Sequence, residues 1–184
     1  MKHLFQNSNT LRILTWFFQN PKKEISLRAL ARQIKFAPST LSRTLKYLTK
    51  DNFLSKRKEA NLTYFKAAEN QKFKALKVAH TISVLQDSEI IPLIEENSQA
   101  LSSLLLYGSA ARGEDGSTSD YDFLIIAQGC SLPHAKLSNI LKRETNLKHF
   151  TISQWEKISK ENRAFYLEAI SNSIALIGQK PVID

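Results

Sequence analysis

Two aspartates separated by one residue are the clearest chemical feature of the sequence. Asp120 and Asp122 open "SDYDFLIIA", an apolar run that predicts a buried strand. Side chains at positions i and i+2 of a strand point to the same face, so these two carboxylates would lie side by side. Such a pair is costly unless a cation neutralises it, and carboxylate oxygens suit Mg²⁺ or Mn²⁺. The spacing therefore predicts a divalent cation site that would also bind the phosphates of a nucleotide.

The segment before these aspartates predicts the elements that would surround them. "ALSSLLLYGS" predicts a buried strand that ends in a turn at Gly108 and Ser109, and "AARG" predicts the start of a short helix. A strand, a turn, a helix and a second strand would then bring the turn close to the acids. The alternative is a surface loop that leads into an edge strand, and it would bury both carboxylates without partners.

These motifs resemble the GS…RG…SDxD signature of the DNA polymerase beta nucleotidyltransferase superfamily, and the nearest pattern is its minimal prokaryotic group. The resemblance covers about residues 88–178. It implies that backbone amides at the Gly-Ser turn hold triphosphate oxygens, as a helix N-terminus can, and that both aspartates ligate the metal. The residues that the resemblance assigns to nucleotide binding are Gly108, Ser109, Arg112 and Ser119, and those that it assigns to the metal and to catalysis are Asp120 and Asp122.

Active members of this superfamily use a third carboxylate on a later strand. The candidate strand here is "LKHFTIS", residues 147–153, which contains no Asp or Glu. The nearest acids are Glu144, expected in the preceding helix, and Glu156, expected after the strand. His149 is a candidate for the third catalytic position because imidazole can act as a base, although a histidine on a strand is more often structural. The sequence therefore predicts nucleotide binding with reduced or lost transfer.

The positive charge of the chain is concentrated in its first third. Residues 1–68 contain 14 Lys and Arg against 3 Asp and Glu, whereas residues 69–184 contain 12 against 14. A basic segment beside a mildly acidic one predicts that the first segment binds a polyanion and that the second has another role. We therefore expect three parts, with a DNA-binding domain at 1–68, a connector helix at 69–87 and a nucleotidyltransferase-like domain at 88–184.

Helical patterns in the first third predict a helix-turn-helix. "NTLRILTWFFQN" predicts a helix that stops at Pro21, and Ser26 is a plausible N-cap for a second helix. "APSTLSRTLKYLTKDNFL" predicts a third helix, in which Leu41, Leu45 and Leu48 share one face. The opposite face of this third helix is free to enter a groove of DNA.

A β-hairpin is predicted directly after these helices. "FLSKRK" and "LTYFKAA" alternate around "EAN", and the whole segment, roughly residues 8–68, resembles the winged helix-turn-helix domains of bacterial and archaeal transcription regulators. Alternatives are solvated surface charge or a winged helix that binds only protein. The expected contacts to double-stranded DNA are Ser39, Thr40, Ser42, Arg43, Lys46, Lys56, Arg57 and Lys58.

The connector predicts a helix with Ala75, Val78, Ala79, Ile82 and Leu85 on one stripe. Such a helix either pairs two chains into a homodimer or covers the sheet of the second domain. The sequence does not separate these two roles.

Composition places the chain among cytoplasmic proteins. Its single cysteine, Cys130, cannot form an internal disulfide, the first residues lack the pattern of a secretory signal, and no apolar run is long enough to cross a membrane. We expect an α+β fold and a DNA-binding, transcriptional regulator that also binds a nucleoside triphosphate with Mg²⁺ or Mn²⁺. The alternative is an active, antitoxin-like enzyme that transfers a nucleoside monophosphate to a protein or a small molecule.

Overall fold

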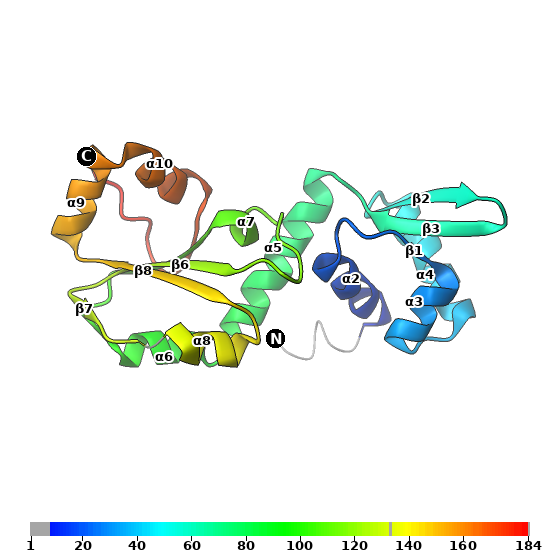
Figure 1. Ribbon diagram of the computed structural model, residues 1–184, viewed down its shortest axis with the longest axis horizontal. Helices are drawn as coiled ribbons and strands as arrows, with labels where there is room; N and C mark the ends of the chain where they lie inside the picture. Colours follow the sequence, from blue (N-terminus) through cyan, green and yellow to red (C-terminus); the bar gives the residue numbers. More distant parts are fainter. Residues whose placement is uncertain (1–7, 133, 184) are drawn as a thin grey trace. The chain divides into compact units, whose positions relative to one another are not determined.

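The computed structural model describes residues 8–132 and 134–183 (Figure 1). Residues 1–7, Pro133 and Asp184 lie outside this description. The chain divides into two compact units, Met1–Lys77 and Val78–Asp184, which we call the first and the second unit and describe separately. The predicted domain boundaries at residues 68 and 87 stay a prediction.

The first unit is a winged helix-turn-helix. Helices α2 (Asn9–Gln19), α3 (Leu27–Ile34) and α4 (Pro38–Lys50) are followed by the hairpin of β2 (Leu54–Glu59) and β3 (Leu62–Ala67). Ser26 caps α3, as predicted, because its side chain accepts a hydrogen bond of 3.4 Å from the backbone N–H of Ala29. Leu41, Leu45 and Leu48 are buried and pack with residues of α2 in one apolar core, which confirms the predicted face of α4.

One short strand of this unit is absent from the sequence prediction. Strand β1 (Ile25–Ser26) pairs antiparallel with β3, where Ile25 lies opposite Phe65. The resulting sheet has the order β1-β3-β2, and both Ile25 and Phe65 belong to the core. A strand of two residues has no alternating pattern of its own, so only its pairing with β3 defines it.

Helix α5 (Gln71–Gln86) does not have the apolar stripe that its sequence predicts. Ala75 and Ala79 are exposed, whereas Phe73 is buried in the core of the first unit and Leu85 in that of the second. The stripe prediction was wrong because the two ends of this helix pack against different cores, so that no single face is apolar throughout. The homodimer through this helix stays a prediction.

The second unit is built on a mixed sheet of strands β5 (Ser103–Tyr107), β6 (Tyr121–Ile126), β8 (Thr145–Phe150) and β9 (Ile174–Gly178). The strand order is β8-β6-β5-β9, and β6 and β8 are parallel while the other pairs are antiparallel. The remaining elements are α6 (Ile90–Glu96), β4 (Ser98–Gln99), α7 (Gly108–Ala111), β7 (Gly129–Cys130), α8 (His134–Leu141), α9 (Ile152–Glu161) and α10 (Arg163–Asn172).

Helices cover both faces of this sheet (Figure 1). Ile94 of α6 and Leu137 of α8 pack on the face that carries Phe123 and Ile125, while Trp155 of α9 packs on the opposite face. Strands buried on both sides read as continuous apolar runs, which is why β5 and β6 were predictable. The predicted α+β class, with a winged helix-turn-helix, a helix between the two domains and a C-terminal mixed sheet with flanking helices, is confirmed. In the described ranges, no helix is long and apolar enough to cross a membrane.

Candidate functional site

Asp120 and Asp122 converge at the start of β6. Asp122 is the second residue of this strand, Asp120 immediately precedes it, and both are half-buried. The side-chain amide of Asn146 joins them, because its Nδ2 lies 3.1 Å from Oδ1 of Asp122 and 3.3 Å from Oδ2 of Asp120. The amide nitrogen carries two hydrogens and can donate to both acids at once. The predicted side-by-side placement of the carboxylates is therefore present.

Asn146 occupies the strand position beside these acids. Strand β8 begins at Thr145, two residues before the predicted start, and it runs parallel to β6 with Asn146 opposite Asp122. The side chain that β8 places beside the two acids is thus a neutral amide. The sequence analysis missed Asn146 because it began the strand one residue later, at Leu147.

His149 lies away from the acids, so its predicted place in the third position is corrected here. Its register partner is Ile125, and its Nε2 lies 3.1 Å from the carbonyl oxygen of Ala127. Residues 146 and 149 are three apart on one strand, so their side chains point to opposite faces of the sheet. This histidine is held at the far end of β6.

Glu144 is also placed differently from its prediction. Helix α8 ends at Leu141, and Glu144 directly precedes β8, where its carbonyl oxygen accepts a hydrogen bond of 2.9 Å from the N–H of Tyr121. Its backbone therefore lies beside the start of β6. Even so, no group of three or more His, Cys, Asp and Glu side chains that could hold a metal forms within residues 8–132 and 134–183.

Gly108 gives the Asp122 carboxylate its space. A Cβ built at residue 108 would lie 2.4 Å from Oδ2 of Asp122, a distance that real side chains do not show. Gly108 also has φ +72°, which favours glycine. Helix α7 begins at Gly108 and has one turn, two residues before the predicted start at Ala110. Ser109 follows in this turn and is half-buried.

Two predicted nucleotide-binding residues already have partners within the protein. Arg112 pairs with Glu168 at 2.5 Å and with Glu114 at 3.0 Å, so its positive charge is neutralised. Ser119 uses its Oγ to accept a hydrogen bond of 2.9 Å from the N–H of Gly116. Phosphate binding by Arg112 would require it to leave two carboxylates, whereas the structure gives it a role in joining α7 to α10.

Arg143, which the sequence analysis missed, fixes the loop that carries Asp120. Its guanidinium pairs with Asp115 at 2.9 Å, and the Asp115 side chain is only 3% exposed. The same guanidinium donates to the carbonyl oxygens of Ser119 and Gly116 and lies 4.0 Å from the ring centre of Tyr121. No sequence motif distinguishes this arginine from its charged neighbours, because its partners lie more than 20 residues away.

Tyr107 and Lys148 lie on the same face of the sheet as Asp122 and Asn146. Tyr107 is opposite Asp122 in the register, and burial, followed by the negative charge of Asp122, raises the pKa of its hydroxyl to about 12. Lys148 is exposed and holds its ammonium 4.2 Å from the ring centre of Phe165. A neutral phenol therefore lies next to Asp122, and the Lys148 ammonium lies on the same face of the sheet.

The residues at this position fit a divalent cation. Two carboxylates converge, and Gly108 leaves Asp122 unobstructed. The Asn146 amide, whose nitrogen faces both acids, would offer its carbonyl oxygen as a third ligand of the kind that Mg²⁺ and Mn²⁺ accept if it turned over. A cation bound by Asp120 and Asp122 would neutralise both charges and attract the phosphates of a nucleotide.

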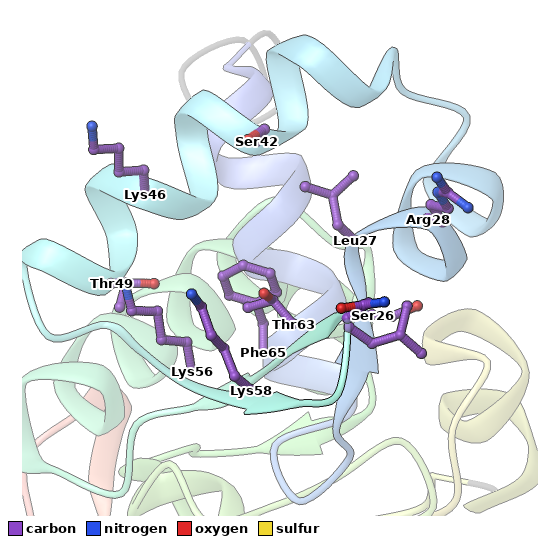
Figure 2. A pocket seen from close by; sticks show the side chains of 12 residues that line it. Ser26, Leu27, Arg28, Ser42, Lys46, Thr49, Lys56, Lys58, Thr63 and Phe65 are labelled. Carbon is purple, nitrogen blue, oxygen red and sulfur yellow. The ribbon is translucent and has the colours of Figure 1, made fainter.

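A basic pocket of about 490 Å³ lies between α3, α4 and the hairpin of the first unit (Figure 2). Its cationic side chains are Arg28, Lys46, Lys56 and Lys58, and its lining includes no acidic residue. Figure 2 shows Lys56 and Lys58 extending from β2 toward α4. The pocket brings together predicted DNA contacts from two elements that are separate in the sequence.

Arg57 does not share this surface. It lies on β2 between Lys56 and Lys58, and alternation along a strand turns its side chain to the other face. There it pairs with Glu24 at 2.8 Å and with Glu59 at 2.7 Å. The hydrogen bond from Arg57 lowers the pKa of Glu24 and raises that of the guanidinium. Arg57 therefore lies outside the basic pocket with which it was grouped.

The other predicted DNA contacts divide into two sets. Ser42 lines the pocket, whereas Ser39, Thr40 and Arg43 are exposed on α4 without lining it. The sequence analysis missed Arg28, which reaches the pocket from α3. It lies on α3, three residues before the buried Ala31, and only the packing of α3 beside the hairpin reveals its position.

Several solved structures are similar to a part of this chain. A crystal structure described as a toxin-antitoxin with AMP-PNP is 20% identical, covers 50% of this chain and 73% of its own, and has a TM-score of 0.40. Reduced HlyU from Vibrio cholerae is 22% identical, covers 44% and 81%, and has a TM-score of 0.36. The transcriptional regulator HlyU from Vibrio vulnificus is 25% identical, covers 39% and 74%, and has a TM-score of 0.34.

A search of curated protein sequences found no match to this chain. Comparison with protein-family models found one for the second unit. Residues 88–172, which contain both aspartates and Asn146, match the family model of the nucleotidyltransferase domain.

Proposed function

We propose that this chain is a DNA-binding transcriptional regulator whose second unit binds a nucleoside triphosphate with Mg²⁺ or Mn²⁺ and transfers little or no nucleotide. The observation that supports it most directly is Asn146 beside Asp120 and Asp122. Residues for cation binding are kept in a segment that matches the nucleotidyltransferase domain, but a neutral amide stands where catalysis needs an acid. Binding is then favoured over transfer.

The basic pocket supports DNA as the partner of the first unit. Four cations surround it without an acid, and the exposed residues of α4 lie next to it. Phosphate contacts by Lys and Arg release counterions from DNA, so affinity falls steeply with salt. Short hydroxyls and Arg43 on α4 add groups that can read base edges.

Two hairpin variants test this role with a control from the same strand. The Lys56→Ala/Lys58→Ala protein should bind duplex DNA more weakly at every sequence, and the slope of log affinity against log salt should flatten by about 2. Arg57→Ala should leave the slope near its wild-type value, because this guanidinium is neutralised by Glu24 and Glu59. Fluorescence anisotropy at several salt concentrations measures both. Equal salt slopes in the wild type and in both variants would contradict DNA binding at this pocket.

Calorimetry tests nucleotide binding by the second unit. ATP and GTP should bind in the presence of Mg²⁺, and binding should disappear in Asp120→Asn/Asp122→Asn, which keeps the shape of both side chains but removes their charge. Glu161→Gln is the matched control, since its exposed carboxylate pairs only weakly with Lys157 at 3.6 Å. Undiminished binding by the double aspartate variant would place the nucleotide elsewhere.

An active nucleotidyltransferase is the rival function, and the family-model match together with the backbone position of Glu144 favours it. If Glu144 supplies the missing acid, labelled nucleotide should be transferred by the wild-type protein to protein, nucleic acid or small acceptors. Glu144→Gln and Asp122→Asn should then both abolish transfer. Robust wild-type turnover with this pattern would replace our proposal with the enzyme.

A further inference from the structure

We propose that Asn146 limits the aspartate pair to one divalent cation, and that this residue keeps the second unit a nucleotide binder. The inference rests on the proposed cation binding by Asp120 and Asp122. It concerns what the neighbouring strand contributes to that site.

The amide of Asn146 reduces the repulsion between the two carboxylates, as a bound cation would. Its NH₂ group donates to Asp122 at 3.1 Å and to Asp120 at 3.3 Å, so the two negative charges share one donor. The opposite orientation would bring a carbonyl oxygen against two anions, which the charges forbid in a cation-free protein. The amide therefore stabilises the two carboxylates without adding charge.

The number of charges then decides how many cations the site accepts. Two carboxylates carry a charge of −2, which one divalent cation balances, and the Asn146 carbonyl oxygen can join them as a neutral ligand. An aspartate at the same place would give three carboxylates and draw in a second divalent cation. Two cations are what a symmetric clamp on the attacking and leaving oxygens of phosphoryl transfer requires. With Asn146 the site can therefore bind one cation and a nucleotide, but it does not hold the two cations that nucleotide transfer requires.

The register of the sheet makes this effect specific to one residue. Asn146 lies opposite Asp122, whereas His149 lies opposite Ile125 and points to the other face. An acid added at residue 149 contributes the same charge to the protein but cannot reach the pair. Asn146→Asp and His149→Asp therefore each add one carboxylate to β8, and only the first can reach Asp120 and Asp122.

Titration of the full chain with Mn²⁺ alone, followed by electron paramagnetic resonance, tests the proposal. The wild-type protein and His149→Asp should each bind one Mn²⁺ at the aspartates, whereas Asn146→Asp should bind a second one and hold the first about tenfold more tightly or better. Asn146→Leu, which keeps the side-chain size but neither donates nor ligates, should bind Mn²⁺ more weakly and melt at a lower temperature without it.

The outcomes separate this inference from the proposed function. Absence of Mn²⁺ binding in the wild-type protein, or binding that survives Asp120→Asn/Asp122→Asn, would contradict the cation site itself. One Mn²⁺ of unchanged affinity in both Asn146→Asp and His149→Asp would leave that site intact and overturn the role of Asn146. A second Mn²⁺ in Asn146→Asp, with a larger Mn²⁺-dependent rise in Tm and a gain of labelled-nucleotide transfer, is the expected result.

Discussion

Gly108 lacks a Cβ atom, and this leaves space for the Asp122 carboxylate. Gly108 combines a φ of +72° with a hypothetical Cβ position only 2.4 Å from Oδ2 of Asp122. Backbone strain and side-chain crowding therefore act at the same residue. This position connects the stability of the second unit to its ability to bind a cation.

Gly108→Ala should destabilise the protein by about 1–2 kcal/mol from the left-handed backbone alone. It should also weaken Mn²⁺ binding, because Asp122 must move away from the added methyl group. Urea unfolding and Mn²⁺ titration measure the two effects. Gly129→Ala is the control, since a Cβ there would meet only the Gln99 side chain, at 3.5 Å from Oε1 and farther from its other atoms, which is ordinary contact. Wild-type affinity in Gly108→Ala would show that Asp122 adapts without cost.

Among the elements of the fold, the loop between α7 and β6 depends on a residue from a different segment. Arg143, just before β8, binds Asp115, Gly116 and Ser119 of this loop. Because the loop ends at Asp120, the arginine positions one member of the acidic pair without touching it. An effect of Arg143 on cation binding would therefore be transmitted through the backbone.

Arg143→Met should destabilise the second unit by about 3–5 kcal/mol, because it leaves the Asp115 carboxylate buried without its ion pair. Arg143→Lys should recover part of that stability but less of the Mn²⁺ affinity, since a lysine supplies the charge without the planar fork that spans two carbonyls. Lys157→Met is the exposed control and should change stability by less than about 1 kcal/mol. Equal Mn²⁺ affinity in Arg143→Lys and the wild type would contradict the positioning role.

The sequence predicted which helices and strands form better than it predicted where a strand begins and which strand it pairs with. Leu41, Leu45 and Leu48 followed a helical period, and the runs of β5 and β6 were apolar throughout, so local pattern was sufficient for them. The start of β8 and the existence of β1 depend on partner strands, which no local pattern specifies. An error of two residues in β8 was enough to overlook Asn146 and to select His149.

The site was predictable to the same degree. The spacing of Asp120 and Asp122 is encoded within one strand, so their convergence followed from alternation alone. Arg112 and Arg57 were expected to face phosphates because of their charge and motif. Arg112 and Arg57 instead pair with Glu168 and Glu24, which are distant in the sequence. Tertiary packing makes these pairs, so the local sequence pattern could not predict them.

The whole molecule has separate apolar cores in its two units. Leu41 is fully buried in the first unit and Leu124 in the second, and the two belong to different clusters. Helix α5 contributes Phe73 to one core and Leu85 to another. The cores should therefore melt as distinguishable cooperative units, as is common for chains of more than one domain.

Calorimetric scans should show two transitions, and each of two core variants should lower only one of them. Leu41→Ala should destabilise the first unit and Leu124→Ala the second, by about 2–5 kcal/mol each. Duplex DNA should then raise the midpoint temperature of the transition that Leu41→Ala lowers. Mg²⁺ with ATP should raise the midpoint temperature of the other transition. A single transition that moves with either substitution would show instead that α5 couples the units into one cooperative block.

The amide between Asp120 and Asp122 also has a consequence for inheritance. Codons for asparagine and aspartate differ in a single base, so a gene that encodes Asn146 is one point mutation away from a gene that encodes a third acid beside Asp122. The rest of the sheet needs no change, because the two side chains have nearly the same shape. Related genes could therefore change from encoding a protein that binds a nucleotide to encoding one that transfers it through a single substitution. No intermediate step would require a protein that fails to fold.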